Sequence, residues 1–62
     1  MEEASYYFEQ AMRARRLATG MTRRDIREKL LRLAEEYDEV AKDIAQGARV
    51  RHPELLRRGA QI

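Results

Sequence analysis

The sequence predicts an all-α protein, an antiparallel hairpin of two helices that dimerises into a four-helix bundle. Three observations support this fold class. Charged residues make up 39% of the chain, with only three glycines and one proline, which is typical of long helices. A single strong turn signal lies about a third of the way along the chain. After that turn, apolar residues recur with heptad spacing.

The first helix is expected over residues 3–18. Acidic residues lie near its start and arginines near its end, and both complement the helix dipole. One stripe consists of Tyr7, Ala11, Ala14 and Ala18. Because the middle of this face is alanine, a second helix can approach closely. We also expect Phe8 in the core, and Arg15 either extended to solvent or paired with an acidic residue of the opposing helix.

The stretch TGMTRRDI predicts a tight turn at residues 19–22. Gly20 is expected to end the first helix in the left-handed conformation. Thr22, followed three residues later by Asp25, predicts the N-cap and capping box of the next helix. A hydrophobic staple across this cap would join Met21 and Ile26.

The second helix is expected over residues 23–46, with Gly47 as its stop. Its heptad seam consists of Ile26, Leu30, Leu33, Tyr37, Val40 and Ile44. Ala34 and Ala41 widen this face. At about 1.5 Å per residue, the second helix is about 36 Å long and the first about 24 Å. The first helix therefore cannot cover the whole seam, and a second hairpin is the simplest cover.

Chain length also favours self-association. A domain of 62 residues buries only about 60% of its unfolded surface and usually needs a further source of stability. There is no cysteine and one histidine, which argues against disulfides, thiolate or His-rich metal sites and cofactors. A homodimer or a tetramer is expected instead. The expected interface residues are Tyr7, Ala11, Ala14, Ile26, Leu30, Leu33, Ala34, Tyr37, Val40, Ala41 and Ile44.

Residues 1–47 thus form the predicted hairpin, and residues 48–62 a basic tail with four arginines and one glutamate. Pro53 predicts a short helical turn over residues 53–58, from which Leu55 and Leu56 could dock on a neighbour. A disordered tail is the other interpretation. No apolar run approaches the roughly 20 residues of a membrane span, and the acidic N-terminus lacks a signal-peptide core. A cytoplasmic protein without membrane contact is expected.

An enzyme is not expected. The acidic residues of the second helix lie largely off its seam, where a solvated face is the simpler interpretation; they are Glu35, Glu36, Asp38, Glu39 and Asp43. Bundle metal sites of this kind need a Glu-x-x-His, and the only histidine is His52, expected to be exposed and without a role. No nucleophile–base pair or phosphate-binding loop is present.

Nucleic-acid binding is the alternative interpretation. The stretch ARRLATGMTRRDIREKL resembles a helix-turn-helix in outline, with a basic start to its second helix. Two positions depart from that pattern, because Arg16 replaces the usual small residue and Lys29 the usual apolar one. The second helix also continues far beyond the length of a recognition helix. The candidate contacts are Arg16, Arg23, Arg24, Arg27, Arg49 and Arg51.

Over residues 5–45, YYFEQAMRARRLA followed by DIREKLLRLAEEYDEVA resembles a group of very short bacterial proteins. Their pattern is an A-x-x-R-x-L-A helix followed by an R-x-x-L-x-x-L-A-x-x-Y-D helix. The second motif is present from Arg27 to Asp38, and the first only in its R-x-L-A part, from Arg15 to Ala18. The resemblance implies a helical hairpin and carries no assigned activity. The predicted role is a non-enzymatic structural or adaptor module that binds itself or another protein.

Overall fold

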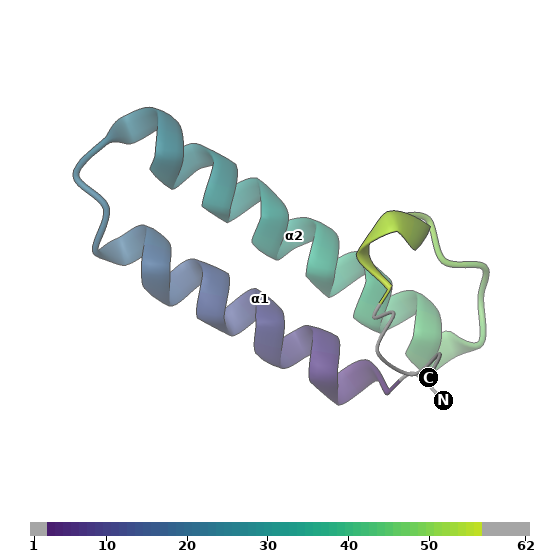
Figure 1. Ribbon diagram of the computed structural model, residues 1–62. Coiled ribbons are helices and arrows are strands. Elements are labelled where there is room, and N and C mark those ends of the chain that lie inside the picture. Colours follow the sequence, from purple (N-terminus) through teal and green to yellow (C-terminus); the bar gives the residue numbers. More distant parts are fainter. Residues whose placement is uncertain (1–2, 57–62) are drawn as a thin grey trace, which may run out of the picture.

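A computed structural model describes residues 3–56 as two antiparallel helices followed by a short segment that folds back onto the second helix (Figure 1). The helices are α1, Ala4–Thr19, and α2, Arg24–Gln46. A 3₁₀ turn, η1, spans Pro53–Leu55. The predicted all-helical hairpin is confirmed, and each long helix starts or ends within about one residue of its predicted limits.

The alanine stripe of α1 is the inner face of the hairpin. Ala11, Ala14 and Ala18 are at most 5% exposed. Ala11 and Ala14 form one buried cluster with Ala34 of α2, and Tyr37 packs against it. A methyl group is the largest side chain that these three positions contribute, which allows the helix axes to lie close together. The small residues therefore set the helix spacing, as the sequence indicates.

A second buried cluster lies beside the first, at the end of the hairpin opposite the turn. It consists of Tyr7, Val40 and Ala41, each 0% exposed. The rings of Tyr7 and Tyr37 stack with centroids 6.3 Å apart, which joins the two clusters across the helix pair. The largest side chains of the hairpin core thus lie at this end.

The turn differs from the prediction at Gly20. Its backbone is right-handed, with φ −87° and ψ −3°. The amides of Gly20 and Met21 donate to the carbonyl oxygens of Leu17 and Ala18, each over 3.1 Å. These bonds span three residues and tighten the last turn of α1 into a 3₁₀ conformation. The prediction of a left-handed Gly20 is therefore wrong, because α1 ends in a 3₁₀ turn whose residues keep a negative φ.

The predicted capping box is also wrong. The N-cap of α2 is Arg23, one residue after Thr22, and it makes no side-chain capping hydrogen bond. Asp25 instead pairs with the Arg23 guanidinium at 3.0 Å. The later helix start also moves Met21 and Ile26 out of the staple positions.

The prediction for Gly47 is confirmed. Gly47 has φ 70°, in the left-handed region, and ends α2. Its amide donates to the Ile44 carbonyl oxygen at 3.1 Å, and the Ala48 amide donates to that of Asp43 at 2.8 Å. This pair of bonds is the Schellman arrangement. It turns the chain back along α2 and so positions the segment that follows.

Candidate interaction surface

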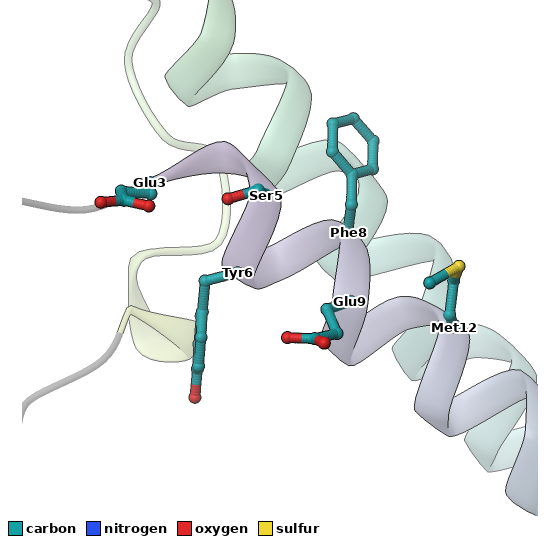
Figure 2. Close-up of a pocket in the computed structure, with 6 residues that line it drawn as sticks. All are labelled: Glu3, Ser5, Tyr6, Phe8, Glu9 and Met12. Carbon is teal, nitrogen blue, oxygen red and sulfur yellow. The ribbon is translucent and has the colours of Figure 1, made fainter.

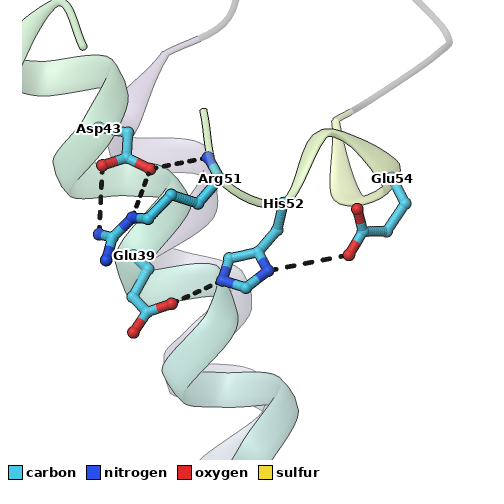
Figure 3. A network of polar contacts seen from close by, with 5 residues as sticks. All are labelled: Glu39, Asp43, Arg51, His52 and Glu54. Atoms are coloured by element: carbon cyan, nitrogen blue, oxygen red, sulfur yellow. Dashed lines mark hydrogen bonds and ion pairs between the residues drawn. The ribbon is translucent and has the colours of Figure 1, made fainter. Parts of the chain in front are cut away.

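The segment from Ala48 to Leu56, called the strap below, is held to α2 by Asp43. One carboxylate oxygen of Asp43 accepts from the Arg51 amide at 3.0 Å and from Arg51 Nε at 3.1 Å (Figure 3). The other accepts from Arg51 Nη2 at 3.2 Å. Asp43 is only 5% exposed, so the predicted solvated role of this residue is wrong. Its charge is compensated inside the fold.

His52 adds a second attachment between the strap and α2. Its Nε2 lies 2.6 Å from a Glu39 carboxylate oxygen, and its Nδ1 lies 3.8 Å from Glu54 (Figure 3). The imidazole side chain is 24% exposed. His52 therefore has a structural role, which corrects the sequence-based expectation of an exposed histidine with no contacts.

These contacts shift the pKa values of Asp43 on α2 and His52 in the strap. The hydrogen bonds from Arg51 hold the pKa of Asp43 below its ordinary value of 3.8, although burial acts in the opposite direction. The hydrogen bond to Glu39 raises the pKa of His52 above 6.5, again against the effect of burial. Both shifts mean that the charged forms favour the attached strap.

Apolar side chains of the strap complete the attachment. Val50, Leu55 and Leu56 are half-buried and pack against the cluster of Tyr7, Val40 and Ala41. The predicted docking of Leu55 and Leu56 is confirmed for the hairpin of the same chain. The predicted helical turn is present at Pro53–Leu55, and the rest of its predicted range, residues 57–58, lies outside the described residues. The strap thus covers the C-terminal end of the α2 seam.

Within residues 3–56, no segment covers the other end of the seam in this way. Ile26, Leu30 and Leu33 are half-buried. They belong to neither buried cluster. Leu17 of α1 is 56% exposed. These four residues are called the open seam below.

A cross-helix ion pair shows that Leu17 and Leu33 lie on the same flank of the hairpin. Arg15 pairs with Asp38 of α2, as one of the two predicted alternatives states, and this pair marks one flank. At 100° per residue, Leu17 projects from α1 on the side away from Arg15, and Leu33 projects from α2 on the side away from Asp38. The open seam is therefore a continuous apolar surface beside the turn.

The predicted interface residues divide into two groups. Six are buried inside the hairpin: Tyr7, Ala11, Ala14, Ala34, Val40 and Ala41. Five are half-buried: Ile26, Leu30, Leu33, Tyr37 and Ile44. The first group forms the intrachain core, so only the second group has surface left for a partner.

The outer face of α1 carries further apolar side chains. Phe8 is 41% exposed, which contradicts its predicted place in the core, because it lies about 100° around the helix from Tyr7. A shallow hollow over this face is lined by Glu3, Ser5, Tyr6, Phe8, Glu9 and Met12 (Figure 2). Figure 2 shows Phe8 and Met12 on one side of α1 and Tyr6 on the other. The lining comes from α1 and its N-cap Glu3, with no contribution from α2, so the hollow lacks the enclosing walls of a binding site.

The six candidate nucleic-acid contacts do not form one surface. Four of them lie at the turn end of the hairpin: Arg16, Arg23, Arg24 and Arg27. Arg49 and Arg51 lie in the strap, at the opposite end (Figure 1). Arg51 is engaged by Asp43, and two of the turn arginines pair with acidic neighbours, Arg23 with Asp25 and Arg24 with Glu28 at 3.1 Å. The positive charge is therefore divided and partly neutralised.

The part of the chain that the structure describes, residues 3–56, contains no cluster of three or more His, Asp or Glu side chains placed to hold a metal ion. None of its helices combines the length and the apolar character that crossing a membrane requires.

The arrangement as a whole defines a two-helix hairpin closed at one end by a strap and bearing an open apolar seam at the other. Comparison of the chain with protein-family models, with curated proteins and with solved structures finds no match. The resemblance to short bacterial hairpin proteins therefore stays a prediction.

Proposed function

We propose that this protein is a non-enzymatic structural or adaptor module that self-associates through its helical hairpin. The observation that carries the proposal is the open seam, where three large residues of α2 are left half-buried by α1 and the strap. A homodimer is the simplest assembly, and two hairpins would form a four-helix bundle.

The energetics of the hairpin support this proposal. Much of the α1–α2 contact is made by alanines, which bury little apolar surface each. Each Å² of apolar surface removed from water contributes about 25 cal/mol, so the larger Ile26, Leu30 and Leu33 are where further burial would contribute most. A chain of 62 residues has few other sources of stability. A second copy would bury the side chains that α1 leaves half-buried.

The test is the solution mass by light scattering over a concentration series. The wild-type protein is expected to approach a multiple of 7.3 kDa as concentration rises. Leu33→Asp should shift it toward the monomer, because a charge would enter the apolar contact. Leu31→Asp is the matched control, since Leu31 is 43% exposed and lies on the Arg15–Asp38 flank. A wild-type protein that stays monomeric at every concentration would exclude self-association and favour a different protein as partner.

The nucleic-acid-binding regulator stays an alternative with less support, because its candidate arginines lie at both ends of the hairpin. A fluorescence titration with labelled duplex DNA and with RNA at low salt would test it. Binding that disappears in Arg23→Ala and Arg27→Ala but survives Leu33→Asp would favour this alternative.

A further inference from the structure

We infer that two copies meet through antiparallel α2 helices, in the register that places Lys29 of each chain beside the partner's Glu36, and that the strap limits the length of this contact. The inference rests on the proposed self-association and specifies its geometry. It follows from three features of α2, namely a row of charged residues, the position of the apolar residues beside that row, and the point where the strap begins to cover it.

The charged row consists of Lys29, Glu36 and Asp43. These residues are seven apart, so they project from the same side of α2. They flank Ile26, Leu33 and Val40 on the side opposite to Ala34, which faces α1. A helix that covers the open seam from outside would therefore pass beside this row.

Among the described residues, only Asp43 of this row has an ion-pair partner. Asp43 is bound by Arg51 of the strap. Within residues 3–56, neither Lys29 nor Glu36 forms an ion pair, although the Glu36 charge is among the lesser causes that raise the pKa of His52. Lys29 is exposed and Glu36 is half-buried. Two residues of opposite charge, one heptad apart, thus remain available on the open side of the seam.

A two-fold axis perpendicular to α2 would form the contact between Lys29 and the partner's Glu36 twice. When Lys29 lies beside the partner's Glu36, symmetry places Glu36 beside the partner's Lys29. The same register sets Leu30 against the partner's Leu33 and the reverse, and Ile26 against the partner's Tyr37. Flanking positions of this type determine register and orientation in paired helices. Charge and apolar packing therefore agree on one antiparallel register.

Leu17, the α1 residue of the open seam, fits the same axis. Ala14 packs at the level of Ala34, so Leu17, about one turn further along α1, lies at the level of residues 30–33 in the antiparallel pair. The two-fold axis passes α2 between residues 31 and 32. Leu17 is therefore close to the axis, where its exposed side chain adds to the same contact.

The strap limits the contact at the other end. The next seam residue after Tyr37 is Val40, which is 0% exposed, with strap leucines packed against its cluster. A second helix cannot reach Val40 while the strap is attached. The uncovered length, from Ile26 to Tyr37, is the length that the proposed register uses.

The experiment uses two charge reversals, Lys29→Glu and Glu36→Lys, with the dissociation constant measured by sedimentation at low salt. Each single variant creates two like-charge contacts in the dimer, so its dissociation constant should rise about tenfold or more. An equimolar mixture of the two variants should associate about as tightly as the wild type, because both contacts are then attractive. The double variant should also regain wild-type association. Glu35→Lys is the control, since Glu35 is exposed and one position removed from the row.

Each outcome has a definite meaning. Weakening by both single variants and recovery in the mixture supports the register. A wild-type dimer that is unaffected by either reversal, or weakened no more than by Glu35→Lys, overturns the register and leaves the proposed self-association intact. A wild-type monomer overturns both. Circular dichroism of each variant checks that helicity is retained, which is the expected result at the exposed Lys29 and is measured separately at the half-buried Glu36.

Discussion

The substitution Val40→Ala tests whether the strap forms part of the folded core. Val40 is 0% exposed and is buried with Tyr7 and Ala41, and residues of the strap pack against this cluster. Removing two methyl groups loses about 0.8 kcal/mol each in transfer free energy. The vacated space adds to this, and the whole effect is about 2–3 kcal/mol of unfolding free energy. The unfolding free energy of a domain is about 0.05–0.15 kcal/mol per residue, so this chain of 62 residues would lose a large share of its stability.

The assay is urea unfolding followed by far-ultraviolet circular dichroism, at a concentration where the chain is monomeric. Met12→Ala is the matched control, because Met12 is 56% exposed and its loss should change the free energy by less than about 0.5 kcal/mol. Leu56→Ala completes a double-mutant cycle. If the strap covers Val40, the two substitutions should couple by about 0.5 kcal/mol or more. A Val40→Ala variant as stable as Met12→Ala, or additive with Leu56→Ala, would refute this description of the strap.

Three further predictions concern the helix ends and the strap. Gly20→Ala should stabilise the fold by about 0.4–1 kcal/mol, because φ is −87° and the new methyl group would meet its nearest atom at 3.7 Å. Gly47→Ala should destabilise the fold by about 1–2 kcal/mol, because φ is 70° there. If urea unfolding shows that both substitutions change the unfolding free energy in the same direction, this reasoning is wrong. Arg23→Ser should stabilise α2 by about 1 kcal/mol by supplying the missing N-cap acceptor, as thermal unfolding would report; no gain would mean that the first turn is already capped. The strap should be most firmly attached between about pH 4 and 6.5. The pKa of Asp43 is lowered, so its stabilisation is lost on acidification below 3.8. The pKa of His52 is raised, so its stabilisation is lost as the pH rises above 6.5. Stability measured against pH should lose its alkaline decline in His52→Gln, and persistence of that decline would contradict the assignment to His52.

Periodicity in the sequence was enough to predict the hairpin. The spacing of Tyr7, Ala11, Ala14 and Ala18 defines the inner face of α1, and these residues are the ones buried. The stop at Gly47 was equally predictable, because few residues other than glycine adopt a positive φ without strain. These features depend on local chemistry and on one-dimensional spacing.

The helix start and the strap were less predictable for physical reasons. Helix ends fray, and their limits vary by one or two residues. The choice of Arg23 over Thr22 as N-cap depends on how the turn closes. Asp43 lies on the polar side of α2 by every periodicity criterion. Its burial arises only because the chain returns over it after Gly47 and brings Arg51 alongside. A contact that forms only because the chain folds back on itself cannot be predicted from the spacing of residues along a helix.

The hydrogen bond from the Arg51 amide to the Asp43 side chain gives the strap its own kinetic reporter. Most backbone amides in α1 and α2 are bonded within a helix and exchange their hydrogen with solvent only when that helix opens. The Arg51 amide is held by one carboxylate over 3.0 Å. Its exchange rate therefore measures how often the strap detaches while the hairpin stays folded. Local opening in this segment is expected to have a smaller free energy than global unfolding, so the end of the seam nearest Val40 would be exposed transiently in every folded molecule.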